Sequence, residues 1–202
     1  MTALESTIRL VADALRELDR RWALVGGLAV SARAEPRFTR DIDLAVVVED
    51  DADAERLVHA LLQRGFETLA SVEQKGVGRL ATIRLTAPSA KRGVKGVVVD
   101  LLFASSGIED VLVAQADTIQ VLPGLQLPVA RVGHLLATKV LARDDKRRPQ
   151  DAADLRALLE EAEQHDLALA EAALMLITQR GFARGRDLKA AWRALLDEQS
   201  GE

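Results

Sequence analysis

The chain has 202 residues, 49% of them hydrophobic and 29% charged, which is the balance of an ordinary globular protein with ample core material. Its net charge of −4 and its 3% of aromatic residues argue against a protein that coats nucleic acid. The absence of cysteine excludes disulfides and thiolate metal sites. The charged N-terminus has no signal core, and no run reaches the ~18 apolar residues of a membrane span. We therefore expect a cytoplasmic protein without membrane contact.

The first 125 residues alternate between helical and strand patterns and then become rich in strand patterns. Apolar residues at helical spacing predict the first helix, and β-branched runs predict the strands. The predicted elements are, in chain order, a helix over 3–20, a strand over 22–25, a helix over 28–34, a strand over 42–48, a helix over 49–63, and strands over 66–72, 79–86 and 95–103. Such an order predicts an α/β fold (α+β) with a small mixed β-sheet flanked by helices.

The sequence changes character after PGLQLPVA, which covers residues 123–130. Four helical patterns follow, separated by charged residues or by glycine and proline. We therefore place a boundary near residue 126, which predicts one domain over residues 1–125 and a C-terminal helical subdomain over residues 126–202.

Two features near the N-terminus indicate a binding site. Gly26 and Gly27 stand where the strand over 22–25 turns into a helix, and consecutive glycines let a ligand approach the backbone closely. The N–H groups at the start of the following helix are suited to an anion. Paired glycines are common at such turns, so this feature alone is a weak signal.

Three carboxylates elsewhere in the first 125 residues are candidate metal ligands. Asp41 and Asp43 lie two apart at the start of a strand, so both side chains point to the same face. Like charges held side by side repel each other unless a cation lies between them, and hard oxygen ligands suit Mg²⁺ or Mn²⁺. Asp100 ends the apolar run GVVVD and becomes the third carboxylate if its strand is a neighbour of the first. Such a group of acids suits phosphoryl or nucleotidyl transfer with two metal ions.

The combination resembles the DNA polymerase β-like nucleotidyltransferase superfamily. Its signature is a hydrophobic residue, two small residues, roughly nine to thirteen residues, an Asp-x-Asp pair and a later acid. Here thirteen residues separate Gly27 from Asp41. The wording GGLAV…PRFTRDIDLAV is similar to the AbiEii/AbiGii toxin-type branch, in which Arg-x-Thr precedes the acids as Arg37 and Thr39 do here. The segment HLLATKVLARDDKRRPQDAADLRALL also resembles that branch, so the resemblance covers roughly residues 22–160.

The resemblance implies a role for each matching residue. Gly26 and Gly27 would hold the triphosphate of an NTP substrate, with Arg37 and Thr39 beside them. Three acids would hold the metals: Asp41, Asp43 and Asp100. Asp100 would also accept the proton of the acceptor hydroxyl. The role implied for Lys139 is to neutralise triphosphate charge. The later aspartate of the family matches either Asp151 or Asp154, and Gly27 departs from the serine that many members have.

Three hypotheses for function remain open at this stage. In the first, the enzyme transfers an NMP to RNA, such as a tRNA 3′ end, as the toxin of a toxin–antitoxin pair with a cognate antitoxin as partner. In the second, the acceptor is a small hydroxylated molecule of the aminoglycoside or lincosamide kind. In the third, the chain is an inactive binding or antitoxin module. A basic face beside Asp41 would favour RNA, an acidic pocket would favour a cationic small molecule, and the three retained acids argue against an inactive module.

Overall fold

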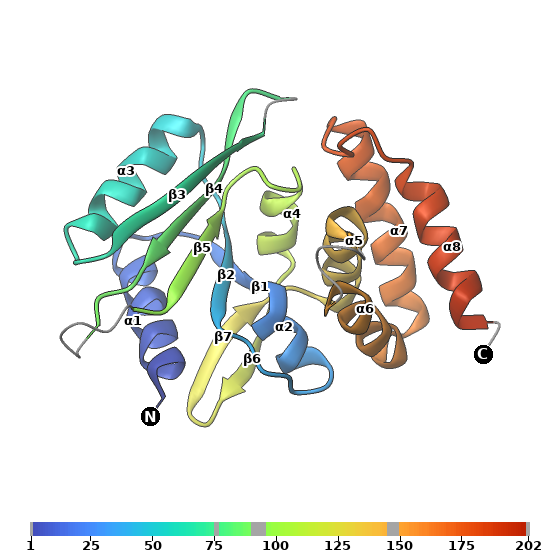
Figure 1. Cartoon of the computed structure of the whole chain (residues 1–202), viewed down its shortest axis with the longest axis horizontal. Helices are drawn as coiled ribbons and strands as arrows, with labels where there is room; N and C mark the ends of the chain where they lie inside the picture. The colour runs from blue at the N-terminus through green and yellow to red at the C-terminus, as the bar shows by residue number, and fades with distance from the viewer. Residues whose placement is uncertain (1, 75–76, 90–95, 145–149, 201–202) are drawn as a thin grey trace.

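A seven-stranded mixed sheet forms the centre of the N-terminal part of the molecule (Figure 1). The structure is a computed structural model that describes residues 2–74, 77–89, 96–144 and 150–200. The sheet order is β3-β4-β5-β2-β1-β7-β6. The strands are β1 (Trp22–Val25), β2 (Asp41–Val46), β3 (Glu67–Gln74), β4 (Arg79–Thr86), β5 (Val98–Leu102), β6 (Asp117–Leu122) and β7 (Leu125–Val129). The mixed sheet with flanking helices confirms the predicted fold class.

The central strands bring the candidate acids to one place. β2 runs parallel to β5 and antiparallel to β1, and its alternate residues Ile42 and Leu44 are fully buried. Since neighbouring side chains of a strand point to opposite faces, burial of these two residues turns Asp41 and Asp43 to the other face. The register places Asp43 level with Asp100 of β5. Sheet pairing therefore joins two segments that lie more than fifty residues apart in the chain.

Helices cover both faces of the sheet. The helices of this part are α1 (Ala3–Glu17), α2 (Gly26–Arg33), α3 (Asp51–Leu62) and α4 (Glu109–Ala114). Figure 1 shows α1 and α3 on one side of the sheet, and α2 and α4 on the side that faces the C-terminal helices. Over the described residues, no helix has the length and apolar character that crossing a membrane requires.

Four further helices form the C-terminal region, as the sequence predicts. They are α5 (Val132–Ala142), α6 (Gln150–Glu161), α7 (Gln164–Gln179) and α8 (Leu188–Ser200). α5 lies at their centre and packs against α6, α7 and α8, while α2 contacts both α5 and α6. One hydrophobic core runs through both regions, because buried side chains of the sheet and of α5 to α8 belong to the same cluster. The division into residues 1–125 and 126–202 stays a prediction, and β7 spans that position.

Three of these elements have no counterpart among the predicted ones: α4, β6 and β7. α4 has only six residues, which is too short for a helical period to show. β7 contains Pro128, a residue that normally argues against an interior strand. It is tolerated here because β7 pairs fully with β6 but meets β1 at a single register position, Leu24 opposite Val129.

Candidate active site

The three predicted acids lie on adjacent strands and line one cavity of about 720 Å³. Asp41 and Asp43 come from β2, and Asp100 lies beside Asp43 on β5. Asp41 keeps about half of its side chain exposed, whereas Asp100 is buried. The fold thus gathers the acids as the sequence predicts, with one carboxylate near solvent and one deep in the cavity.

Arg84 of β4 binds the deepest of the three acids. It lies opposite Asp100 in the antiparallel pairing of β4 with β5. Its guanidinium donates two hydrogen bonds to the Asp100 carboxylate, at 2.8 Å and 2.6 Å, and lies 4.0 Å from an oxygen of Asp41. These bonds to Asp100, with the charges of the other acids, raise the pKa of Arg84 further above its ordinary value. The arginine is therefore the charge partner of the acidic group.

Sequence reasoning missed Arg84. A signal for it does exist, since the strand pattern RLATIRLT places a charged residue in the middle of a strand. Only the pairing of β4 with β5 reveals that this charge faces an acid.

Gly26 forms the wall next to Asp43. Its φ of +63° lies in the left-handed region, which residues other than glycine rarely adopt. A Cβ atom at this position would overlap the Asp43 carboxylate. Two independent constraints, the backbone conformation and the close approach, therefore require glycine here.

Gly27 gives similar room to Arg37. A Cβ atom on Gly27 would meet the Arg37 guanidinium, which lies over the start of α2. Arg37 and Thr39 both line the cavity. The Thr39 hydroxyl donates to the backbone carbonyl of Asp41 and so fixes the entry into β2. A cationic group and the N-terminal N–H groups of α2 consequently face the same region, where an anion would be stabilised.

A buried network of opposite charges connects this region to the C-terminal helices. The Lys139 ammonium on α5 lies 2.8 Å from Asp151 and 2.6 Å from Asp154, both on α6. Asp154 also accepts from Arg37 at 2.9 Å. Only 9% of the Lys139 side chain is exposed, and the two aspartates are fully buried. Lys139 therefore holds α6 against α5, while Asp154 orients the arginine above Gly27.

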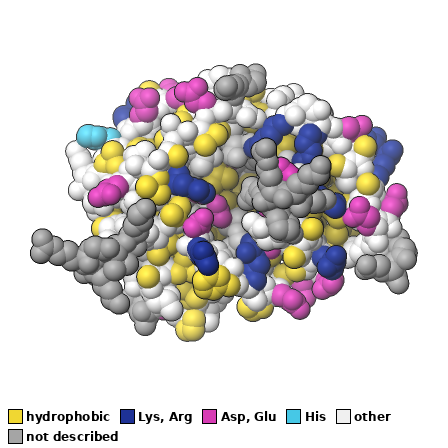
Figure 2. Space-filling view, in the orientation of Figure 1, with side chains coloured by type: hydrophobic (Ala, Val, Ile, Leu, Met, Phe, Trp, Pro, Cys, Tyr) yellow, Lys and Arg dark blue, Asp and Glu magenta, His cyan; other side chains and the backbone are white. Residues whose placement is uncertain are grey.

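The cavity gathers nearly all of the predicted site residues. Asp154 is the exception, because it lies behind Arg37 and Lys139 and contacts the cavity through those two side chains. The predicted residues that line the cavity are Gly26, Gly27, Arg37, Thr39, Asp41, Asp43, Asp100, Lys139 and Asp151. Figure 2 shows Lys and Arg side chains on either side of acidic ones near the middle of this face.

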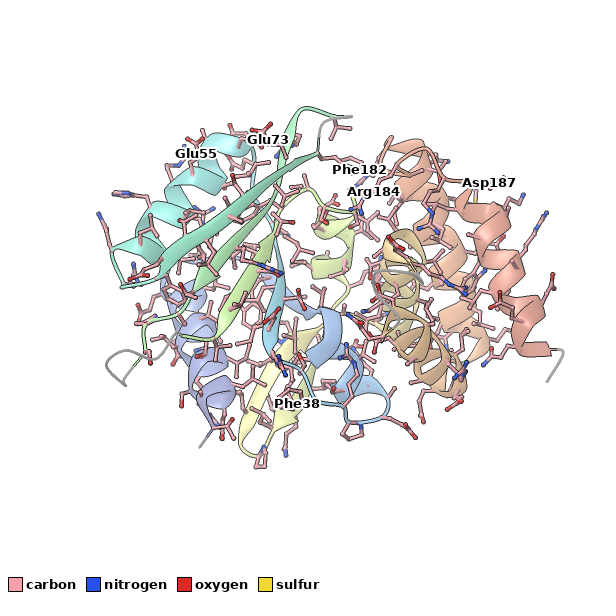
Figure 3. The ribbon with its side chains drawn as sticks, viewed as in Figure 1. Phe38, Glu55, Glu73, Phe182, Arg184 and Asp187 are labelled. Carbon is pink, nitrogen blue, oxygen red and sulfur yellow. The ribbon has the colours of Figure 1, made fainter. Side chains whose placement is uncertain are left out.

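A further carboxylate that the sequence motifs did not predict, Glu109 at the start of α4, also lines the cavity. Burial raises the pKa of Glu109, although the N–H groups of Ser105 and Ser106 and the hydroxyl of Ser106 all donate to its Oε1. The exposed Arg184, between α7 and α8, donates to the carbonyl of Ser105. Figure 3 shows Arg184 and Phe182 facing the α4 side of the sheet. This end of the cavity is thus built from both regions of the chain.

The donor set suits a divalent cation, but it is not arranged as a ready-made metal site. Within the described residues, no three side chains of His, Cys, Asp or Glu are placed to hold a metal ion. Asp41 and Asp43 supply oxygen ligands on one face of β2, as Mg²⁺ prefers. Asp100 completes the set chemically, yet its oxygens are engaged by Arg84. The residues therefore fit a cation if Arg84 releases Asp100.

The fold and site define the class of protein, and comparison with solved structures agrees. The chain is similar to an antigenic nucleotidyltransferase-like protein from Paracoccidioides brasiliensis, with a TM-score of 0.58 and 21% identity over 95% of this chain and 92% of that one. It is also similar to the antibiotic-resistance factor ANT(2'')-Ia (TM-score 0.57, 16% identity, 100% of both chains). A third similar structure is the lincosamide antibiotic adenylyltransferase LnuA, solved with lincomycin bound. Its TM-score is 0.50 and its sequence identity 14%, over 78% of this chain and 98% of that one. These likenesses show a nucleotidyltransferase fold.

The family model for the nucleotidyl transferase AbiEii toxin of a type IV toxin–antitoxin system matches residues 9–201. The chain therefore belongs to the AbiEii toxin family of nucleotidyltransferases and is an enzyme of that class. This match confirms the resemblance that the sequence motifs indicate and extends it to the C-terminal helices. A search of curated proteins found no match.

Proposed function

We propose that this enzyme transfers an NMP from an NTP to a hydroxyl of RNA and acts as the toxin of a toxin–antitoxin pair. The observation that carries the proposal is the juxtaposition of Asp41, Asp43 and Asp100 with the Gly26 turn in one cavity. A turn that presents backbone N–H groups suits phosphates, and clustered carboxylates suit divalent cations. Membership of the AbiEii family supports a cognate antitoxin as partner.

The residues divide the reaction between them. The backbone at Gly26 and Gly27 and the guanidinium of Arg37 would bind the triphosphate, with Lys139 adding positive charge below them. Asp41, Asp43 and Asp100 would hold Mg²⁺ or Mn²⁺. The metal, when bound, stabilises negative charge on the phosphates. The acceptor oxygen forms a bond to the α-phosphorus, the bond from that phosphorus to the β-phosphate oxygen breaks, and pyrophosphate leaves. Asp100 would take the proton of the acceptor hydroxyl.

The charge around the mouth of the cavity supports a polyanionic acceptor. Arg40 and Arg184 line the cavity and are exposed. Two of the cavity acids are already paired inside the protein, Asp100 with Arg84 and Asp151 with Lys139. Exposed arginines at the mouth would contact the phosphates of an RNA chain, as basic side chains do in nucleic-acid complexes generally.

A small cationic acceptor is the second candidate, and one observation favours it. Glu109 is a buried carboxylate on the cavity wall and would pair with an amine of such a molecule. LnuA and ANT(2'')-Ia, which share the fold, are described as an antibiotic adenylyltransferase and an antibiotic-resistance factor. The two candidates differ in where the transferred nucleotide is found.

Transfer of radioactive label tests the proposal. The protein is incubated with Mg²⁺ and each of the four α-³²P NTPs, with total RNA, with the protein alone, or with an aminoglycoside or a lincosamide. We expect label in RNA, and we expect Asp43→Asn to abolish it. Asp13→Asn, at an exposed acid of α1, is the matched control and should transfer normally. Label in the small molecules alone would replace RNA by the second candidate. Transfer by Asp43→Asn at the normal rate would contradict the site.

A further inference from the structure

The segment Arg37–Arg40 alternates between inward and outward side chains as it leads into β2. Arg37 reaches inward to Asp154, and Thr39 hydrogen-bonds to the backbone of β2. Phe38 and Arg40 are the outward pair, and both are exposed. Both also line the cavity, and the Arg40 guanidinium contacts the Phe38 ring. Phe38 and Arg40 therefore lie together at the mouth of the cavity, and we call them the rim pair.

Phe38 differs from every other aromatic residue of the chain. The sequence has four phenylalanines, two tryptophans and no tyrosine. Five of these six rings are buried, with between 2% and 8% of their surface exposed: Phe66, Phe103, Phe182, Trp22 and Trp192. Phe38 is 80% exposed. A protein that buries all its other rings has no packing reason to leave this one in solvent, so the exposure points to a binding role.

The rim pair lies next to the acids and the glycine turn of the candidate active site. Both of its residues line the same cavity as Gly26 and Asp41, and Arg40 directly precedes Asp41 in the chain. The Arg40 guanidinium lies over the Phe38 ring, 5.6 Å from its centroid. Because Phe38 is 80% exposed with this contact in place, its ring remains open to a ligand. Figure 3 shows Phe38 on the segment between α2 and β2, away from Arg184 and α4.

We propose that the rim pair is a nucleobase-stacking subsite, with the base resting on the Phe38 ring and Arg40 beside it. This inference rests on the proposed function, because it takes the cavity to bind nucleotides. A flat apolar ring next to a guanidinium matches a base, which offers a π-face to the ring and is attached to a phosphate that attracts the cation. Stacking tolerates every base, so the subsite would add affinity without selecting a sequence.

The base has two possible sources, the NTP itself or the last nucleotide of an RNA acceptor, and base-free probes separate them. Binding of each NTP and of inorganic tripolyphosphate, all with Mg²⁺, is measured by calorimetry. Binding of a single-stranded RNA oligonucleotide, with or without an abasic 3′ residue, is measured by fluorescence anisotropy. Each measurement uses the full chain, Phe38→Ala and Phe38→Trp. Leu69→Ala is the matched control, since Leu69 is an exposed apolar residue on β3 outside the cavity.

Loss of one stacked base should weaken binding about tenfold in Phe38→Ala, and Phe38→Trp should restore it. A loss for NTPs but not for tripolyphosphate assigns the subsite to the NTP base. A loss for intact RNA but not for abasic RNA assigns it to the acceptor. The proposal is overturned if Phe38→Ala binds every base-containing probe with normal affinity, as it would if the ring bound a protein partner. It is also overturned if Phe38→Ala lowers the affinity for base-free probes by the same factor.

The same experiment keeps this proposal separate from the proposed function. Affinity is measured without turnover, so a chain that binds nucleotides through Phe38 but transfers no label would contradict only the transferase. A chain that transfers label to RNA at the normal rate and with normal affinities in Phe38→Ala would contradict only the stacking subsite. Substituting Arg40→Gln should weaken base-containing probes less than Phe38→Ala, because the ring supplies the stacking surface.

Discussion

Substituting Lys139→Met should destabilise the protein severely, because the lysine is the cation shared by two buried acids. Its ammonium lies within 2.8 Å of Asp151 and 2.6 Å of Asp154, whose side chains are 0% and 1% exposed. Removing one partner of a buried ion pair costs about 3 to 5 kcal/mol, since the remaining charge loses its compensation. Asp154 keeps its contact with Arg37, so we expect the lower half of this range. For a chain of this length a loss of about 3 to 4 kcal/mol corresponds to a Tm lower by roughly 6 to 16 °C.

Urea unfolding followed by tryptophan fluorescence measures this loss. The two tryptophans are buried reporters in different regions, Trp22 in β1 and Trp192 in α8, so the signal follows both sheet and C-terminal helices. Lys189→Met, at an exposed lysine of α8, is the control and should change the free energy of unfolding by less than about 0.5 kcal/mol.

A second variant tests the physical cause. Adding Asp151→Leu to Lys139→Met removes one of the acids that lost its cation, so part of the stability should return. If the free energy of unfolding of Lys139→Met lies within about 1 kcal/mol of that of the unsubstituted chain, the lysine is not the structural partner of these acids. Its ammonium would then serve the triphosphate alone.

Three other substitutions test the remaining features. Gly124→Ala places Ala at positive φ in open space and should lose about 1 to 2 kcal/mol in urea unfolding. Gly26→Ala adds overlap with the Asp43 carboxylate to the same backbone cost, so it should lose more stability and should abolish NMP transfer, which Gly124→Ala should not; equal stability and activity of the two variants would refute the packing against Asp43. Arg84→Gln removes a cation from the acids, so it should tighten Mn²⁺ binding on the order of tenfold, as measured by electron paramagnetic resonance. Arg84→Lys keeps the charge and should not tighten it. Unchanged Mn²⁺ affinity in both variants would refute competition between Arg84 and the metal for Asp100. Burial lowers the pKa of His134 to about 4, so the free energy of unfolding should fall by about 3 kcal/mol as the pH falls from about 6.5 to about 4. His134→Leu should flatten this part of the pH profile measured by urea unfolding. An unchanged slope would show that other groups cause the pH dependence.

Much of the site could be predicted because its residues lie in short local motifs. The pattern Asp-x-Asp at the start of an apolar run specifies a strand with two acids on one face, whatever the rest of the chain does. The glycine pair and Arg37 follow from the same stretch of sequence. Local periodicity and spacing predicted the two acids and the glycine pair, the family resemblance added Arg37, and all five residues line the cavity. The position of Asp100 depends on which strands pair, and the parallel register of β2 with β5 places it beside Asp43.

Other features could not be predicted, because they depend on contacts between distant segments. Asp151 and Asp154 looked equivalent in sequence, but only Asp154 reaches both Lys139 and Arg37. Glu109 belongs to no motif, and the charge of Arg84 within a strand pattern does not reveal its partner; β4 and α4 bring both residues to the cavity. The short α4 and the proline-containing β7 lacked the periodicity from which elements are recognised.

The sequence by itself therefore determined the order of the main elements, the two acids of β2 and the family of the chain, since each of these is encoded in neighbouring residues. The tertiary structure decided which charges meet. It set Arg84 on Asp100, placed Lys139 between two buried aspartates and left Phe38 exposed at the mouth of the cavity. The physical reason is that charge pairing and burial act through space, between strands and helices whose separation along the chain carries no record of their contact.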